Sequence, residues 1–470
     1  MLFNSLQFLW FLPLVFAVWK LLSTRWKPVW LLAASYFFYM QCGVWFAGLL
    51  LLTTITDWYV ALRIERAATP KIRRNWLLLS VLSNIGVLAG FKYSAFFWNT
   101  GLWLSGSGDY ISNFIVPAGL SFYTFQSLSY TIDVYRGTIA AEKNATRFAL
   151  FVSFFPQLVA GPVERYSHLG SQLVHPKALN TDALAAAGRL MIWGFFKKIA
   201  IADRLAAYVD PLFAAPENFA ASTLALGGLV FAVQVYCDFS GYTDIATGTA
   251  RLFGVELMLN YRRSLLSRSL HEFWQRNHIS MTNWFRDYVY RPLGGNRVAP
   301  WRIQVNLLLT FLISGLWHGA SWAFVIWGML HGLVYIAERA VMKRRKKPAS
   351  TLLKFPGWLW FIAVHSLSII AFRAGNTDVL QQYAAQLWNG SWSLYAVYSD
   401  FRHLHDLFPL LIAVAVVALL FAKELEEEYR WLRGSKYFAT ALRPAFYIGV
   451  FVLLFFIGEF GAKAFIYFSF

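Results

Sequence analysis

Apolar runs long enough to cross a lipid bilayer recur along almost the whole chain. A membrane-spanning helix needs about 20 predominantly apolar residues. Hydrophobic residues make up 58% of the sequence and charged residues only 14%, whereas a soluble domain carries about 25% charged residues. We therefore predict an all-α polytopic membrane protein. Its candidate spans are residues 2–22, 29–60, 76–98, 113–132, 146–161, 187–203, 220–238, 303–317, 321–340, 355–373, 407–423 and 441–460.

Glycine and proline interrupt several of these runs. The run 29–60 is long enough for two linked spans with a break near residues 41–43, and Gly119 and Gly161 lie inside or at the end of others. Irregular backbone survives at membrane depth only where it is buried in protein or lines a cavity, so the interruptions predict a solvent-filled interior. The sequence shows no internal repeat and no second soluble domain. We predict one integral-membrane domain over 1–470, with its core over about 115–340 and further spans and a tail over 355–470.

The basic residues gather in short loops between the apolar runs. The net charge is +18, and the two densest clusters of lysine and arginine lie within residues 63–74 and 343–347. By the positive-inside rule both loops face the cytoplasm. Counting spans outward from them predicts that the N-terminus and the tail 461–470 are both extracytoplasmic. Because this distribution accounts for the charge, the sequence favours a lipid bilayer as partner and does not indicate nucleic acid.

Two histidines stand out in the central stretch from His271 to His331. The run 303–317 ends on His318, and 321–340 returns toward the second basic loop, so we predict a hairpin whose turn, HGAS, buries an imidazole. An ionisable residue inside a membrane is a functional candidate by default, and a neutral imidazole is suited to take a proton from a hydroxyl. His278 is the candidate partner. The competing interpretation is a packed core histidine for His318, an ordinary interfacial histidine for His278, and a helix–helix hydrogen bond for His331.

Other chemistry is not indicated by the spacing of the polar residues. The histidines of HEFWQRNH are seven residues apart, whereas a zinc-protease helix needs them four apart, and no cysteine pattern suggests zinc, so we predict no metal. No nucleotide-binding loop or serine-hydrolase motif appears. Asp238 and Asp244 flank Ser240-Gly241, which we expect to form a turn, and we expect the two carboxylates to make structural ion pairs.

An arginine-rich segment precedes the hairpin. Its sequence RPLGGNR predicts a tight turn with backbone amides available, and a phosphate-bearing ligand such as coenzyme A can dock at such a cationic turn. The predicted contacts to this ligand are Arg276, Arg286, Arg291 and Asn296.

With these residues assembled, the chain resembles the membrane-bound O-acyltransferase (MBOAT) family. It is most similar to the bacterial branch that O-acetylates alginate, cellulose or peptidoglycan or transfers D-alanine to teichoic acid. The matching segments are PAGLSFYTFQSLSYTIDVYRG (117–137), FPQLVAGPVER (155–165), CDFSGYTDIA (237–246), FWQRNHISMTNWFRDYVYRPLGGNR (273–297) and LWHGASWAFVIWGMLHG (316–332). The resemblance implies a bundle of about 11 transmembrane helices plus re-entrant or interfacial helices around a central tunnel.

The resemblance also implies roles for three residues. His318 corresponds to the family's catalytic base, and His278 to the second histidine that faces the tunnel. The last residues, FIYFSF, resemble a FIYxxF tail of this branch, in which the tyrosine is proposed to carry the acyl group, here Tyr467. A terminal aromatic anchor is the competing interpretation of the tail. One departure is Asn277, where the branch usually has tryptophan.

The activity implied is transfer of an acetyl group from cytoplasmic acetyl-CoA across the bacterial inner membrane. An extracytoplasmic SGNH-type acetyltransferase and the polysaccharide biosynthesis machinery are the implied partners. D-alanyl transfer from a carrier protein is the alternative within the same fold, although that system keeps its tail on a separate small protein. A transporter without covalent chemistry also fits the composition, but leaves the two histidine motifs and the tail unexplained.

Overall fold

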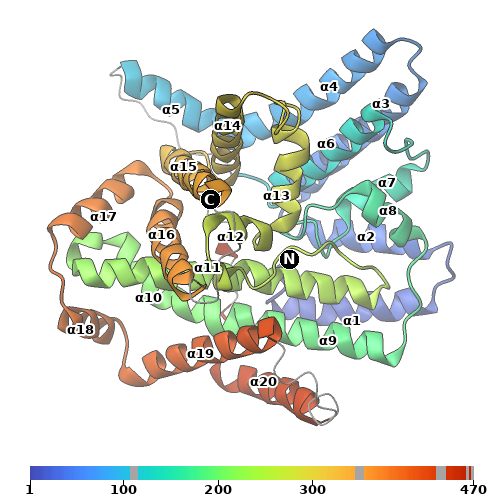
Figure 1. Cartoon of the computed structure of the whole chain (residues 1–470). Coiled ribbons are helices and arrows are strands. Elements are labelled where there is room, and N and C mark those ends of the chain that lie inside the picture. The colour runs from blue at the N-terminus through green and yellow to red at the C-terminus, as the bar shows by residue number, and fades with distance from the viewer. Residues whose placement is uncertain (106–114, 345–353, 430–440, 462–464, 467–470) are drawn as a thin grey trace. The chain divides into compact units, whose positions relative to one another are not determined.

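Every regular element in the described part of the chain is a helix, which confirms the predicted all-α class. The computed structural model describes residues 1–105, 115–344, 354–429, 441–461 and 465–466 (Figure 1). The chain divides into two compact units, Met1–Met191 with Thr243–Leu259 and Ile192–Tyr242 with Asn260–Phe470. The α-helices are α1 (Leu6–Leu21), α2 (Lys27–Met40), α3 (Val44–Arg66), α4 (Pro70–Leu88), α5 (Ser94–Ser105), α6 (Leu120–Arg136), α7 (Ala145–Ser153), α8 (Tyr166–Val174), α9 (Thr181–Phe195), α10 (Asp203–Ala214), α11 (Ala221–Leu252), α12 (Leu270–Arg276), α13 (Ile279–Phe285), α14 (Pro300–His318), α15 (Trp322–Arg344), α16 (Lys354–Ala374), α17 (Thr377–Asn389), α18 (Leu394–Leu404), α19 (Leu407–Tyr429) and α20 (Arg443–Ile457). Short η1 (Ala89–Tyr93), η2 (Phe196–Ala202) and η5 (Arg286–Tyr290) are π-helical, and η3 (Pro216–Asn218) and η4 (Ser264–Leu266) are 3-10 helices.

Several helices are long and apolar enough to cross a membrane. Within the described residues there are six: α3, the continuous helix Pro70–Ser105, α11, α15, α16 and α19, and α1 and α20 are shorter apolar helices. The break predicted near residues 41–43 is confirmed, because α2 ends at Met40 and α3 begins at Val44. The predicted span 146–161 is wrong in its second half. There α7 ends at Ser153, shortly before Pro156, as helices usually do ahead of a proline.

The first unit buries a polar cluster among α3, α4 and α6. Asp57 is fully buried and accepts hydrogen bonds from Ser80 Oγ at 2.6 Å and from Asn84 Nδ2 at 2.9 Å. Ser80 Oγ also lies 3.1 Å from Thr131 Oγ1 on α6. A buried polar group is costly unless it is hydrogen-bonded, so this cluster fixes how the three helices pack.

Two of the segments that resemble the family meet inside the first unit. Gly119 has a φ of 76°, and a Cβ there would lie 2.6 Å from the carbonyl oxygen of Leu158. Only glycine combines that conformation with so close an approach. The side chains of Gln126 and Gln157 both donate to the carbonyl of Phe151, at 2.6 and 3.0 Å. The glycine of PAGL and the glutamine of FPQLVAG therefore have a packing role in this unit.

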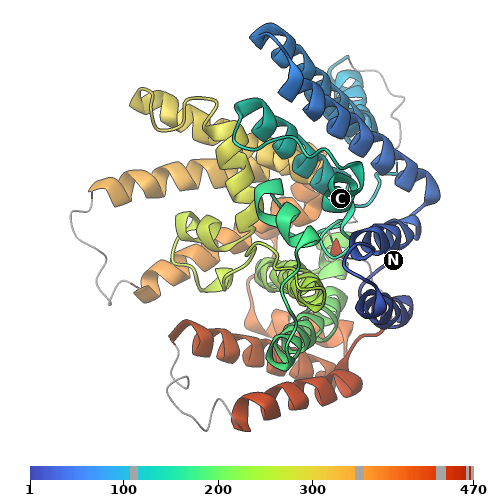
Figure 2. The same cartoon turned by 90° about the vertical axis from the view of Figure 1, so that its right-hand side faces the viewer.

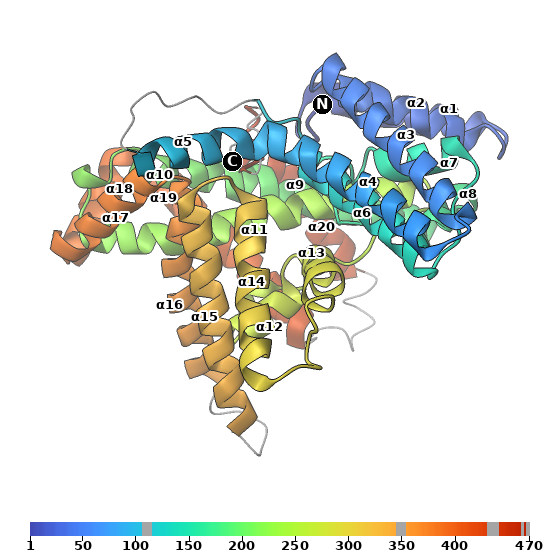
Figure 3. The same cartoon turned by 90° about the horizontal axis from the view of Figure 1, so that it is seen from above.

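In the second unit, α14 and α15 form the predicted hairpin. Figure 3 shows the two helices lying side by side. Glycines let their backbones approach closely, since a Cβ on Gly315 would lie 2.3 Å from the carbonyl oxygen of Phe324 and one on Gly328 would lie 2.5 Å from that of Phe311. His318 is buried as predicted from HGAS, but it is the last residue of α14 and the turn begins after it.

The turn predicted at Ser240-Gly241 does not exist. Both residues lie inside α11, which runs unbroken from Ala221 to Leu252. Gly241 serves close packing instead, because a Cβ there would lie 2.8 Å from the carbonyl oxygen of Gly194. The helices α19 and α20, drawn in red in Figure 2, also pack against η2 in this unit. Both helices contribute to one apolar core with Trp193, Phe196 and Tyr236.

Candidate active site

The backbone at His278 adopts a conformation that side chains other than glycine rarely take. Its φ and ψ are 47° and 48°, in the left-handed region, between the end of α12 and the start of α13. Such conformations cost free energy and persist where surrounding contacts fix them. Asn260 supplies those contacts: its carbonyl accepts the N–H of Ile279 at 2.9 Å, and its side chain accepts the N–H and hydroxyl of Ser280 at 3.2 and 2.8 Å.

The same asparagine fixes which nitrogen of His278 carries the proton. Because the backbone N–H of Ser280 donates to Asn260 Oδ1, that atom must be the amide oxygen. His278 Nδ1 lies 3.2 Å from it and therefore donates. A neutral imidazole protonated on Nδ1 keeps its lone pair on Nε2. His278 is thus oriented with Nε2 as its basic nitrogen.

His318 is the last residue of α14 and is buried among aromatic rings. Its ring centroid lies 4.8 Å from that of Trp317, 5.2 Å from that of Trp327 and 5.3 Å from that of Phe372. Gly319 must follow it, because a Cβ at that position would lie 1.9 Å from the ring of Phe324. The centroid of His318 lies 6.4 Å from that of His278, so the structure brings the two predicted histidines together.

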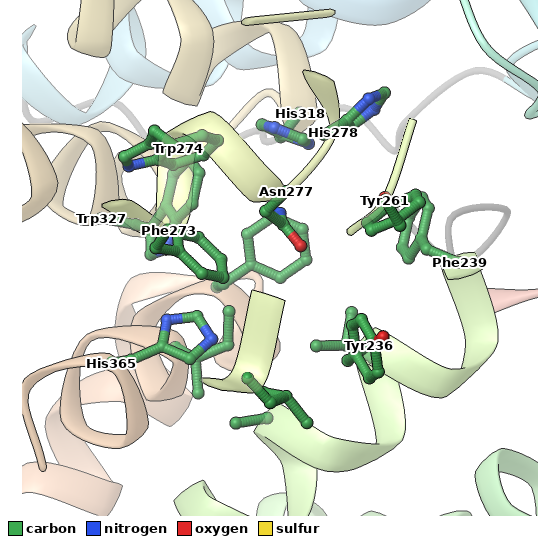
Figure 4. A pocket seen from close by; sticks show the side chains of 15 residues that line it. Tyr236, Phe239, Tyr261, Phe273, Trp274, Asn277, His278, His318, Trp327 and His365 are labelled. Carbon is green, nitrogen blue, oxygen red and sulfur yellow. The ribbon is translucent and has the colours of Figure 1, made fainter. Parts of the chain in front are cut away.

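Both histidines line a small pocket in the second unit. Figure 4 shows His278 and His318 beside each other on one side of the pocket and His365 on the opposite side. The pocket has a volume of about 60 Å³. Its remaining wall is mainly apolar and aromatic: Ala232, Val235, Tyr236, Phe239, Tyr261, Leu265, Phe273, Trp274, Asn277, Trp327, Ile369 and Phe372.

A larger cavity of about 520 Å³ adjoins this pocket. Trp274 lines both spaces. The larger cavity extends from Ser314, four residues before His318, to the charged residues Arg286 and Arg339. Its other lining residues are His271, Gln275, Ile279, Met281, Thr282, Asn283, Phe285, Tyr290, Asn296, Leu307, Thr310, Phe311 and Tyr335. Cavities of this size hold ligands as large as a drug molecule or cofactor.

Polar contacts hold the cations at this cavity. Asn296 Oδ1 accepts from Tyr290 at 2.7 Å and from Arg339 Nη2 at 2.8 Å, and so orients that guanidinium. Arg286 pairs with Asp287 at 3.0 Å. Burial lowers the pKa of His271, which lies in α12 outside the candidate spans, so its imidazole is neutral at pH 7. The lining of the cavity thus includes two guanidinium groups and one neutral imidazole.

The structure gathers only some of the predicted donor contacts. Arg286 and Asn296 line the larger cavity. Arg276 instead pairs with Glu272 at 2.7 Å and Glu428 at 2.9 Å, and Arg291 is exposed and pairs with Asp287 at 3.0 Å.

The glycine turn does not present the amides of Gly294 and Gly295 to a ligand. The expectation of available amides is wrong, since the N–H groups of Gly294 and Gly295 donate to the carbonyls of Arg291 and Tyr290 within the turn. Tyr467 lies outside the described residues. His331 makes the helix–helix hydrogen bond that was the competing interpretation, with Nε2 2.8 Å from Ser368 Oγ.

Two residues at these cavities were missed in the sequence. His365 lies inside the predicted span 355–373 and Arg339 inside the predicted span 321–340, and neither was singled out. His365 is buried, and its Nδ1 has no hydrogen-bond partner in the described part of the chain. An ionisable residue within a predicted span was the available signal for His365. The acid–base pair Glu338-Arg339 near the end of an apolar run was the signal for Arg339.

Comparison with known proteins adds independent evidence. A model of the membrane-bound O-acyltransferase family matches residues 138–374. A protein of Azotobacter vinelandii named "Probable alginate O-acetylase AlgI" is 38% identical over 89% of this chain and 84% of its own length. The peptidoglycan O-acetyltransferase of Helicobacter pylori is 33% identical over 80% of this chain and 78% of its own length. The teichoic acid D-alanyltransferase of Bacillus subtilis is 28% identical over 50% of this chain and 62% of its own length. These matches confirm the resemblance seen in the motifs and the predicted acyltransferase class.

Proposed function

Because this chain belongs to the membrane-bound O-acyltransferase family, we propose that it is an O-acetyltransferase of the bacterial inner membrane. It takes an acetyl group from acetyl-CoA, and that group ends on an extracytoplasmic polysaccharide. The observation that carries this proposal is the pair of adjoining cavities, one small and lined by His278 and His318, the other large and bordered by arginines. The relatives named for alginate and peptidoglycan acetylation support acetyl as the group transferred.

The larger cavity receives the donor. Arg286 and Arg339 face the phosphates of acetyl-CoA, since arginine matches phosphate oxygens with paired hydrogen bonds. Asn296 keeps Arg339 in place. Arg276 and Arg291 do not line the cavity and pair with carboxylates, so neither is given a contact with the donor. The pantetheine arm extends past Phe311 and Ser314 toward Trp274, which brings the thioester to the histidine pocket.

The small pocket holds the acetyl group. Ligand pockets are commonly about 300–1,000 Å³, so a volume of about 60 Å³ suits a small acyl group better than a long one. The apolar wall suits the methyl group. Longer acyl chains would meet Phe372 and Phe273.

His318 acts as the general base. It takes the proton from the acceptor hydroxyl, whose oxygen forms a bond to the acetyl carbonyl carbon. The carbon–sulfur bond then breaks, and the coenzyme A thiolate takes up the proton. His278, oriented by Asn260 with its basic Nε2 beside His318, helps to orient the acceptor hydroxyl.

The acceptor of the acetyl group is the tyrosine of the C-terminal tail. Tyr467 accepts the acetyl group as a phenyl ester and passes it to an SGNH-type acetyltransferase outside the membrane. The finer architecture that we propose, about 11 spans around a tunnel with both termini extracytoplasmic, places donor and acceptor on opposite faces. The family assignment excludes the transporter alternative. D-alanyl transfer remains the second candidate, and the D-alanyltransferase of Bacillus subtilis matches only 50% of this chain.

The direct test is incubation of the purified protein with radiolabelled acetyl-CoA in detergent. We expect label on the protein and release of coenzyme A, and we expect His318→Ala to lower the rate by about 10²–10⁴-fold, the usual range for a general base. His403→Ala is the matched control, because His403 is exposed on α18. Tyr467→Phe should abolish the label. A wild-type protein that neither takes label nor releases coenzyme A would exclude acetyl-CoA as donor.

A further inference from the structure

A buried ion cluster in the second unit has no part in the chemistry described above. Lys198 Nζ lies 2.6 Å from Asp238 Oδ1 and 2.9 Å from Asp203 Oδ1, and all three side chains are at most 4% exposed. Both carboxylates thus contact the same ammonium. Burying charges is costly unless every oxygen finds a partner. The second oxygen of Asp238 therefore needs a donor of its own.

The C-terminal tail supplies that donor. The backbone N–H of Ile466 donates to Asp238 Oδ2 at 2.7 Å. Phe465 is only 2% exposed, and its ring centroid lies 4.3 Å from Lys198 Nζ and 4.6 Å from the ring of Tyr242. The tail thus meets the cluster through one backbone amide and one aromatic ring. These are the two residues that precede Tyr467 in the sequence.

The residues that lead to the tail, 457–459, are held by contacts with Ile199 in η2 and with Arg204. The N–H of Glu459 donates to the carbonyl of Ile199 at 3.0 Å, inside the π-helical turn η2. Arg204 Nη2 donates to the carbonyl of Ile457 at 2.6 Å and lies 3.1 Å from the carboxylate of Glu459. π-helical turns occur frequently at functional sites, and this one also directs Lys198 inward.

The ion cluster lies next to the histidine pocket. Asp238 precedes Phe239 on α11, and Phe239 lines the pocket with its ring centroid 6.4 Å from that of His278. One turn of one helix therefore carries both a contact to the tail and a wall of the pocket.

We propose that Lys198, Asp203 and Asp238 form a tail seat, a binding site that holds Phe465 and Ile466 and so positions the residue after them for acyl transfer. The seat recognises a backbone N–H preceded by an aromatic side chain. Its members are positioning residues, since they touch the tail and not the acetyl group. The consequence for catalysis depends on the function proposed above, whereas the binding of the tail does not.

The binding of the tail is tested without catalysis by carboxypeptidase digestion of the full chain in detergent, followed by intact mass. We expect digestion of the wild type to stop at Ile466, and digestion of Phe465→Ala and Asp238→Asn to pass that residue at least about tenfold faster. Phe460→Ala is the matched control, since Phe460 belongs to the same segment but is 61% exposed. Equal digestion of Phe465→Ala and wild type would overturn the seat.

Catalysis is measured separately on the same variants. Phe465→Ala should lower kcat for acetyl transfer at least about tenfold and leave KM for acetyl-CoA unchanged, because the donor cavity is untouched. Phe465→Leu keeps the apolar volume but not the ring, so it should restore part of the protection and part of kcat. Thermal unfolding identifies any variant that fails to fold. If Asp238→Asn fails to fold, Phe465→Ala still tests the seat. If protection is lost but kcat is unchanged, the positioning role is wrong. If the wild type is protected yet transfers no acetyl group, the proposed function fails and the seat remains.

Discussion

The packing of α14 on α15 gives a quantitative prediction for Gly328→Ala. A Cβ at this position would lie 2.5 Å from the carbonyl oxygen of Phe311, whereas ordinary van der Waals contact begins at 3.4 Å. The helices must therefore separate by up to about 0.9 Å, the difference between these distances. Trp327, the neighbour of Gly328, contacts His318 with ring centroids 5.2 Å apart. We expect this separation to shift His318 relative to His278, the proposed catalytic pair.

A misplacement of about 1 Å can cost about 10²-fold in rate. We expect Gly328→Ala to lower kcat by about that factor. Overpacking costs about 1–3 kcal/mol, and the higher helix propensity of alanine returns about 1 kcal/mol, so the protein should still fold. The assay is coenzyme A release from acetyl-CoA, together with thermal unfolding in the same detergent. Gly449→Ala is the control, because a Cβ on Gly449 in α20 would have no atom within 4 Å. A kcat for Gly328→Ala within about twofold of wild type would refute this account of the hairpin.

Three further predictions concern the pocket, the donor cavity and pH. Phe372→Ala should open the pocket and raise the ratio of kcat/KM for butyryl-CoA to kcat/KM for acetyl-CoA by at least about tenfold. One methylene group changes kcat/KM by about 10–200-fold in a hydrophobic pocket. An unchanged ratio would mean that Phe372 does not limit the length of the acyl chain. Arg286→Ala should raise KM for acetyl-CoA about tenfold, as loss of one charged hydrogen bond predicts. Arg291→Ala, at an exposed position, should change this KM little. Equal effects would mean that the arginines act through their overall positive charge and not through a contact with the donor. A hydrogen bond to Glu164 raises the pKa of His168. The folded state therefore binds the proton of His168 more tightly than the unfolded state does. The resulting stabilisation is present below pH 6.5 and is lost as the pH rises through the raised pKa. The difference in melting temperature between wild type and His168→Gln should therefore shrink from pH 6 to pH 8, and a constant difference would contradict it.

Features that depend on one continuous segment could be predicted from the sequence. The hairpin around HGAS is an example, because an apolar run, a short turn and a second apolar run determine it together. The break between α2 and α3 is another, since Gln41 to Gly43 interrupt a run too long for one span.

Features that depend on distant neighbours could not be predicted. Ser240-Gly241 resembles a turn, and only the carbonyl of Gly194 shows why glycine is needed inside a helix there. His365 reaches the pocket because α16 packs on α15, which no local pattern records. Asp238 was expected to make a structural ion pair, and it does so with Lys198, but its contact with Ile466 joins residues 228 positions apart.

The central claim is that an acetyl group enters from one face of the membrane and leaves on the other. The most direct measurement uses sealed vesicles of the purified protein with labelled acetyl-CoA enclosed on the side of the basic loops. Carboxypeptidase added outside then removes any label carried by the tail. The account predicts that this digestion releases the label from the wild type and that vesicles with His318→Ala give none. Label that external digestion cannot reach, or coenzyme A release with no label on any acceptor, would contradict it.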